Sequence, residues 1–211
     1  MIRDLDAEMR KRGVGGIVVL GDTTLENPDL IYVVGGNLAR GGTYFKRAGR
    51  DPLLVVGSVD IATARKLGRV REIQTYTHWG LEKLAKKYRG RDEALARLIA
   101  TIIRTEGIRG KVGLFGRVDV AFGIHLADTL RRLGVKVVGE RSPTILEAAR
   151  ETKEKGEIDE IRRVGRITAA VVNDVVETLR NMKEKRGHLQ IGKRRATVGL
   201  VKSIISAKLA K

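Results

Sequence analysis

Apolar positions in residues 1–141 form short runs that alternate with stripes of apolar residues three or four positions apart. Short runs between glycine or polar segments indicate buried strands, and stripes with the helical period indicate amphipathic helices. The runs predict strands at 17–20, 30–34, 43–47, 52–56, 72–77, 111–115 and 135–138. The stripes predict helices at 3–12, 59–67, 81–88, 93–106 and 120–133.

The order of these elements predicts an α/β domain over residues 1–141. Gly49, Arg50 and Asp51 stand between two strand-like runs, which is typical of a hairpin. In the second half of the domain, helices alternate with strands, which favours a mixed sheet with helices on both faces.

The pattern changes after Pro143, and residues 142–156 are predicted to be a linker. Apolar residues then recur with helical spacing over 157–182, and a second helical stripe runs from about 196 to 211. Two helices with apolar faces and no third layer need a cover, either more of the same chain or a partner. Residues 157–211 are therefore expected to be the first two helices of an incomplete α+β domain.

Composition excludes several classes of protein. The 211 residues include no cysteine, which removes disulfides, cysteine nucleophiles and thiolate metal sites. No apolar run approaches the ~18 residues that span a bilayer. The N-terminal segment carries acidic residues in its first turn and does not resemble a secretory signal. We expect a cytoplasmic protein with no membrane partner.

The formal net charge of +17 leaves two interpretations open. Clustered Lys and Arg gain affinity for nucleic acid by releasing phosphate counterions. A highly charged surface with only two Gln and four Asn is also typical of a thermophile. Nine basic residues and one acid, Glu184, lie between Lys183 and Lys211, so this segment supplies +8. We favour the charged surface; nucleic acid is the less favoured partner.

Four segments, in order, resemble the creatinase/prolidase ("pita-bread") metallopeptidases, which include Xaa-Pro aminopeptidases and Xaa-Pro dipeptidases. Residues 27–36 are similar to an Asn-x-x-x-x-Tyr-x-x-Gly segment, and the hairpin at 43–56 is similar to a Pro-Leu-Leu-Val pattern. Residues 152–162 resemble a Lys-x-x-x-Glu-Ile-x-x-Ile-Arg entry to the catalytic domain, and the segment after Gly187 resembles its second helix. The resemblance implies a three-layer creatinase N-terminal-like domain followed by an incomplete pita-bread segment.

The family also implies two divalent metal ions, held by two Asp, one His and two Glu on strands downstream of these helices. None of those positions is matched in this chain, so we expect no catalytic residue, no metal ligand and no cofactor here. The resemblance implies the N-terminal region of a Xaa-Pro peptidase-like metallohydrolase that serves oligomerisation, as a homodimer, and substrate access. A peptide substrate would need the missing catalytic domain. The alternative is a non-catalytic binding module of the same fold for an acidic protein or nucleic acid.

Few residues stand out as candidate sites. Residues 35–42 are glycine-rich but lack the spacing of the phosphate-binding motifs, and a connector is the favoured interpretation. In the resembled family this loop approaches a neighbouring active site, which makes Asn37 and Arg40 candidate substrate-access residues. His125 and the adjacent His78 and Trp79 are expected to be structural, and His188 is not expected to bind metal.

Overall fold

The structure is a computed structural model that describes residues 2–67, 69–88, 90–185, 187–191 and 194–210. The chain divides into two compact units, Met1–Thr152 and Lys153–Lys211.

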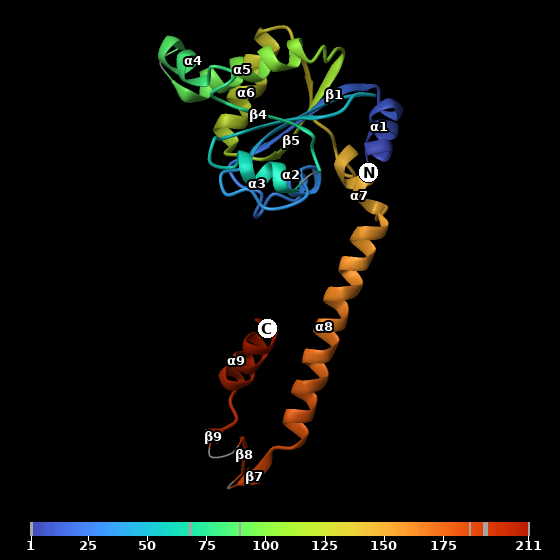
Figure 1. The fold of residues 1–211 in the computed structure, drawn as a ribbon, viewed down its shortest axis with the longest axis vertical. Coiled ribbons are helices and arrows are strands. Elements are labelled where there is room, and N and C mark those ends of the chain that lie inside the picture. The colour runs from blue at the N-terminus through green and yellow to red at the C-terminus, as the bar shows by residue number, and fades with distance from the viewer. Residues whose placement is uncertain (1, 68, 89, 186, 192–193, 211) are drawn as a thin grey trace. The chain divides into compact units, whose positions relative to one another are not determined.

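A six-stranded mixed sheet is the centre of the first unit (Figure 1). Its strands are β1 (Val14–Gly21), β2 (Gly42–Arg47), β3 (Leu53–Val56), β4 (Glu72–Thr75), β5 (Lys111–Arg117) and β6 (Lys136–Val138). They lie in the order β4-β3-β2-β1-β5-β6. β1 pairs antiparallel with β2 and parallel with β5, and the predicted hairpin joins β2 to β3 with Thr43 opposite Val55.

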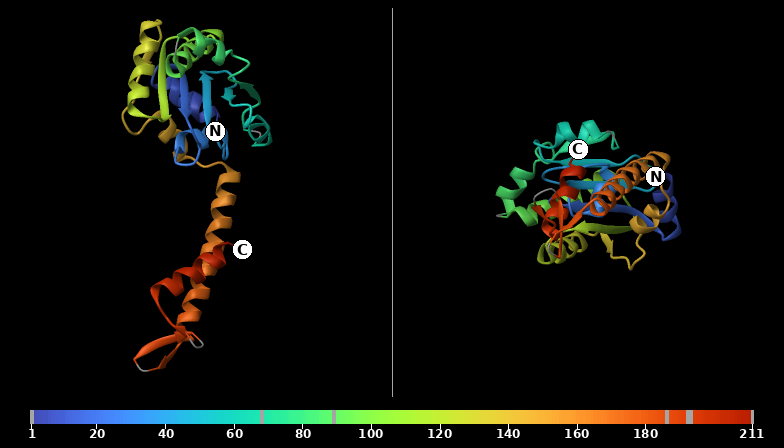
Figure 2. Two further views of the ribbon diagram at one scale, coloured as in Figure 1. Left: turned by 90° about the vertical axis from the view of Figure 1, so that its left-hand side faces the viewer. Right: turned by 90° about the horizontal axis from the view of Figure 1, so that it is seen from below.

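Helices cover both faces of this sheet (Figure 2). They are α1 (Ile2–Lys11), α2 (Pro28–Val34), α3 (Ile61–Leu67), α4 (Leu81–Tyr88), α5 (Arg91–Thr105), α6 (Val120–Arg132) and α7 (Ile145–Glu151). Side chains alternate along a strand, so Ile17 and Val19 of β1 pack with residues of α1, α2, α3 and α7. Val18 and Leu20 pack with residues of α4, α5 and α6 on the other face. The predicted α/β fold with helices on both faces is confirmed.

The strand predicted at residues 30–34 is wrong, because this segment is the helix α2. The Asn27 side chain caps the helix by accepting from the Leu30 amide, and Pro28 occupies the first turn. Gly35 ends the helix with a left-handed φ of 88°. Such a cap, a first-turn proline and a terminal glycine are strong helix boundary signals.

A buried ion pair links α1 to the hairpin of β2 and β3. Lys46 of β2 has no exposed side-chain surface, and its Nζ donates to Asp6 Oδ1 at 2.7 Å. The same ammonium also donates to the carbonyls of Arg47 and Arg50. Asp6 Oδ1 in turn accepts from the Gly49 amide at 2.8 Å. All three donors of the ammonium are satisfied, as a buried charge requires.

The first unit runs beyond residue 141 because α7 packs into its core. Ile145, Leu146 and Ala149 are buried in the same cluster as α1 and α2. Tyr32 also donates from its hydroxyl to the Ala149 carbonyl at 2.9 Å. The segment 142–156 therefore contains a packed helix, while the predicted domain boundaries themselves stay a prediction.

The second unit contains two helices and a small sheet. Its elements are α8 (Lys155–Arg180), β7 (Lys183–Lys185), β8 (His188–Ile191), β9 (Arg194–Arg195) and α9 (Val198–Leu209). The two predicted helices are present, whereas the antiparallel sheet β7-β8-β9 was not predicted. Among the described residues of this unit only Val171, at 8% exposure, is buried. Within the described ranges, neither this unit nor the first has a helix that is long and apolar enough to cross a bilayer.

Candidate functional site

The topology of the sheet marks one edge as a place for a ligand. After β1 the chain adds β2, β3 and β4 on one side, then crosses to add β5 and β6 on the other. β1 and β5 are parallel, so their carboxyl ends lie at the same edge. In open α/β sheets, ligands bind outside the carboxyl ends of the strands where the strand order reverses. Here that point lies between β1 and β5.

A cavity of about 580 Å³ lies at this edge, within the range of small-molecule sites. Its walls come from the residues after β1 and β5, the start of β2, the residue after β4, and the first turns of α5 and α6. The side chains that line the cavity include those of Asp22, Arg40, Thr43, Tyr76, Leu81, Arg91, Asp92, Leu95, Val118, Asp119, Phe122 and His125. The cavity thus combines charged side chains with an apolar wall.

Arg40 is positioned by a loop whose backbone is tied to the sheet. The carboxylate of buried Asp60 accepts from the amides of Ala39 and Arg40 at 3.0 and 2.8 Å. The hydroxyl of buried Thr24 accepts from the Leu38 amide at 2.8 Å. These bonds hold the second half of the predicted connector 35–42 in one conformation. The guanidinium of Arg40 forms no ion pair within the part of the chain that the structure describes.

Arg91 is the second cation of the cavity, at the start of α5. Its guanidinium also makes no ion pair with any described residue. The N-cap of α5, Gly90, supplies no side-chain hydrogen bond.

The start of α6 differs, because Asp119 accepts there from the amides of Ala121 and Phe122. The Asp119 carboxylate is therefore engaged in capping.

Two hydroxyl groups at the cavity wall form a neutral pair. Thr43 Oγ1 and Tyr76 Oη lie 2.9 Å apart. Burial raises the pKa of Tyr76 to about 12, although the Thr43 hydrogen bond and the Arg91 charge oppose the shift. The Tyr76 hydroxyl therefore keeps its proton near neutral pH and can donate a hydrogen bond.

His125, on α6, lines the same cavity and lies close to Glu93. Its Nε2 is 3.2 Å from Glu93 Oε2 but forms no hydrogen bond with it, and this buried nitrogen has no hydrogen-bond partner among the described residues. Burial tends to raise the pKa of Glu93, but hydrogen bonds from Arg97 and Thr129 and nearby positive charge lower it overall. Glu93 therefore carries a negative charge near neutral pH, and its carboxylate is held in place by Arg97 and Thr129.

The structure separates the two residues predicted for substrate access. Arg40 lines the cavity, whereas Asn37 lines a more open hollow with Thr24, Leu25 and Arg117. His78 and Trp79 lie between β4 and α4, outside the lining of the cavity. Their rings meet edge to face, with the ring centroids 6.1 Å apart. Of the remaining cavity residues, His125 was expected to be structural, and the others were not singled out from the sequence.

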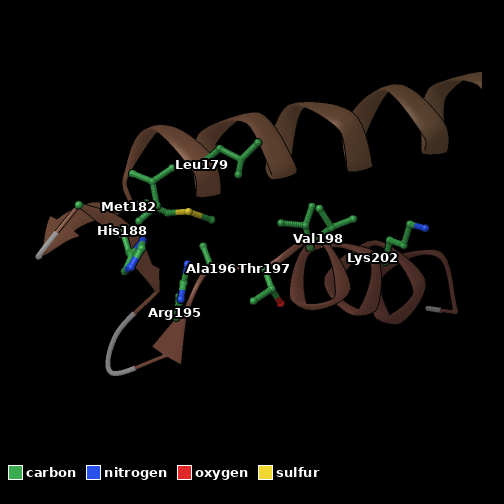
Figure 3. Close-up of a pocket in the computed structure, with 11 residues that line it drawn as sticks. Leu179, Met182, His188, Arg195, Ala196, Thr197, Val198 and Lys202 are labelled. Carbon is green, nitrogen blue, oxygen red and sulfur yellow. The ribbon is translucent and has the colours of Figure 1, made fainter.

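A second hollow, of about 420 Å³, lies in the second unit between the end of α8, the small sheet and the start of α9 (Figure 3). Leu179, Met182 and Val198 form an apolar wall, with His188 and Arg195 on the strands. None of the described residues that line this hollow carries a carboxylate, so His188 has none of the oxygen ligands there that a metal centre of the implied type needs. Nowhere among the described residues do three His, Asp or Glu side chains gather closely enough to hold a metal ion. The described residues therefore do not fit the dinuclear centre that the resemblance implies.

Comparison with known proteins places this fold. No protein-family model and no curated protein sequence match the chain. An X-Pro aminopeptidase from Thermotoga maritima superposes with a TM-score of 0.65 at 13% identity, covering 97% of this chain and 48% of that structure. This chain has the fold of one region of the Xaa-Pro peptidases.

Two further structures support the same assignment. A Xaa-Pro dipeptidase from Bacillus anthracis superposes with a TM-score of 0.64 at 12% identity, over 99% of this chain and 48% of its own. The prolidase from Pyrococcus horikoshii OT3 gives 0.58 at 15% identity, over 98% of this chain and 48% of its own. The chain thus spans about half the length of these structures. The predicted resemblance to the creatinase/prolidase family is confirmed at the level of the fold.

Proposed function

We propose that this chain is the N-terminal, accessory region of a Xaa-Pro peptidase-like metallohydrolase. In this proposal it serves assembly and substrate access and does not hydrolyse peptides by itself. The fold supports the lineage, because 97–99% of the chain superposes on structures of Xaa-Pro peptidases. The observation that carries the proposal is that the described His, Asp and Glu side chains form no group able to hold a metal ion.

The chemistry explains why such a region would be inactive. Metallopeptidases use bound metal to generate a nucleophilic water at neutral pH and to polarise the carbonyl oxygen. A site for two such ions needs several converging carboxylate or imidazole ligands. The acids at the cavity, Asp22, Asp92 and Asp119, do not converge with His125 into such a group.

The proposal is tested by incubating the purified chain with Mn²⁺ or Co²⁺ and the dipeptide Ala-Pro. We expect no release of proline above the rate with metal alone. An intact Xaa-Pro dipeptidase serves as the positive control. Metal-dependent release that a chelator abolishes would overturn the proposed inactivity.

Assembly is the second part of the proposal, with a homodimer formed through the first unit. Residues 1–152 have apolar cores on both faces of their sheet, so this segment is expected to fold alone. Sedimentation equilibrium of the full chain and of residues 1–152 should give twice the chain mass in both cases. A monomeric 1–152 segment would refute a dimer through this unit. Arg40 and Asn37 remain the substrate-access residues of the proposal.

A specific surface favours the alternative function, a nucleic-acid-binding module. Strand pairing places Lys183 beside Gln190 and Arg195, and Lys185 beside His188, on one face of the small sheet. The one acid of these strands, Glu184, pairs with Leu189 on the other face. These cationic residues are all exposed. Such a face can contact phosphates without reading sequence.

Salt dependence tests this alternative. Each phosphate contact contributes about −0.9 to the slope of log affinity against log salt. The triple variant Lys183→Gln, Lys185→Gln, Arg195→Gln should flatten the slope for duplex DNA by about three. The matched control is Lys66→Gln, Lys83→Gln, Lys86→Gln, which removes three exposed charges from the first unit. Equal slopes for the two variants would exclude this surface, and binding only to acidic proteins would point to the other partner class.

A further inference from the structure

We propose that the cavity between the carboxyl ends of β1 and β5 binds a small amphipathic anion. Its carboxylate or phosphate group is held by Arg40 and Arg91, and its apolar part lies against the wall formed by Leu95, Val118 and Phe122. This ligand site is independent of peptide hydrolysis and goes beyond the accessory role proposed above.

The two guanidinium groups determine the charge of the ligand. Arg40 and Arg91 line one cavity but come from segments about fifty residues apart, and neither has an ion-pair partner among the described residues. By contrast, Arg97 of α5 is paired with Glu93, with Nε 2.7 Å from Oε1. The planar guanidinium matches the geometry of carboxylate and phosphate groups and can bind either with two parallel hydrogen bonds. Two such unpaired groups at one cavity favour an oxyanion.

The apolar wall determines the rest of the ligand. Leu81 is buried, and Leu95, Val118 and Phe122 are partly buried on the same side of the sheet. An aromatic or aliphatic group placed against them removes apolar surface from water. An anion with an apolar body should therefore bind more tightly than an inorganic anion of the same charge.

The carboxylates at the cavity restrict the charge that it accepts. The Asp119 carboxylate caps α6 and is not available for a ligand. Asp22 and Asp92 are exposed and line the cavity, where their negative charges oppose an anion. The Asp22 charge raises the pKa of the Tyr76 phenol and the Arg91 charge lowers it, so both charges act at the same wall of the cavity. One anionic group of low charge is favoured over a polyanion.

Neutral donors complete the site. The Tyr76 and Thr43 hydroxyls lie together at the wall, and one of them can turn its proton toward a ligand oxygen. These groups assist the arginines.

Calorimetric titration of the full chain tests the proposal with defined probes. These are phenyl phosphate, hippurate, the neutral hippuramide and inorganic phosphate. We expect saturable binding of phenyl phosphate or hippurate. The affinity for hippuramide and for inorganic phosphate should be lower by a factor of about ten or more. The stronger of the two anions identifies the headgroup. Equal affinity for phenyl phosphate and inorganic phosphate, or no saturable binding of either amphipathic probe, would overturn the proposal.

Variants assign the binding to this cavity. Arg40→Gln and Arg91→Gln should each weaken binding about tenfold, because each removes a charged hydrogen bond. The matched control is Arg109→Gln, an exposed arginine that precedes β5 and so lies at the opposite edge of the sheet. Asp22→Asn should strengthen binding severalfold, an effect that a purely structural role would not produce. Equal loss in all three arginine variants, or weaker binding by Asp22→Asn, would place the anion elsewhere.

These outcomes are separable from the proposed accessory function. Ligand binding is measured without metal or peptide, so turnover of Ala-Pro would leave the cavity proposal intact. Likewise, failure to bind the anions would leave the inactivity claim intact. Thermal melts of the variants are expected to match the parent chain, because both arginine side chains belong to exposed residues.

Discussion

At the scale of single residues, the buried ammonium of Lys46 makes the stability of the first unit depend on Asp6. Asp6→Ala removes its carboxylate partner and leaves three donors with only two acceptors. Removing one member of a buried pair leaves an uncompensated charge, so we expect the free energy of unfolding to fall by about 3–5 kcal/mol. Urea denaturation measures the change.

The paired substitution Asp6→Leu with Lys46→Met is the control for this prediction. It removes both charges and keeps side chains of similar volume, so it should cost much less than Asp6→Ala. If the double variant is as unstable as the single one, packing rather than the unpaired charge governs this position.

Glu93 gives the first unit a dependence on acid pH. Its pKa is lower in the folded chain than in the unfolded chain, where a glutamate titrates near ~4.3. The unfolded state therefore binds the proton first, so this contribution to stability is present above that pH and is lost as the pH falls through the folded pKa. The stability difference between the parent chain and Glu93→Gln should shrink as the pH falls from about 6 to 3. A constant difference across that range, in urea denaturation at each pH, would contradict the assignment.

At the scale of elements, α2 shows the limit of a short apolar run as a signal, because the run predicted a strand and the segment is a helix. The run Leu30–Val34 is apolar enough for a buried strand, and periodicity cannot distinguish the two for so short a run. Asn27, Pro28 and Gly35 are boundary signals of a helix and could have decided the matter from the sequence. The small sheet β7-β8-β9 is harder, because its strands are only two to four residues long and only β8, with Leu189 and Ile191, has any apolar alternation.

Asn27 is the residue on which α2 depends. Its Oδ1 accepts from the Leu30 amide at 3.1 Å, and its Nδ2 donates to the Leu20 carbonyl at 3.1 Å. Asn27→Ala removes the cap and should lower the free energy of unfolding by about 1–2 kcal/mol. Asn27→Asp keeps an acceptor for the cap and should retain more stability than Asn27→Ala. The opposite order, in thermal or urea unfolding, would show that the contact with β1 matters more.

The cavity at the sheet edge could be predicted only in part. Arg40 was selected through the family resemblance, but Asp22, Tyr76, Arg91 and His125 belong to other parts of the chain. They meet because β1 lies between β2 and β5. Local periodicity gives the elements and not their order in the sheet, so the convergence had no signal in the sequence.

At the scale of the whole molecule, the two units differ in how much apolar surface they bury. The first unit has a core on each face of its sheet, whereas α8 exposes Ile161 at 59% and α9 exposes Val198 at 74%. Segments with few buried contacts open at low free-energy cost. Limited proteolysis should therefore cut first within residues 153–211 and leave a fragment near residues 1–152, as measured by mass spectrometry. Initial cleavage within the first unit would contradict this difference in local stability.

At the level of function, we propose that this chain, which has the fold of a region of the Xaa-Pro peptidases, holds no metal centre of its own. Calorimetric titration of Mn²⁺ into the purified chain at neutral pH tests it most directly. We predict heats of dilution only, because no group of three possible ligands exists among the described residues. Saturation at one or two ions per chain would contradict the account, and loss of that saturation in His188→Ala would locate the ligands in the second unit.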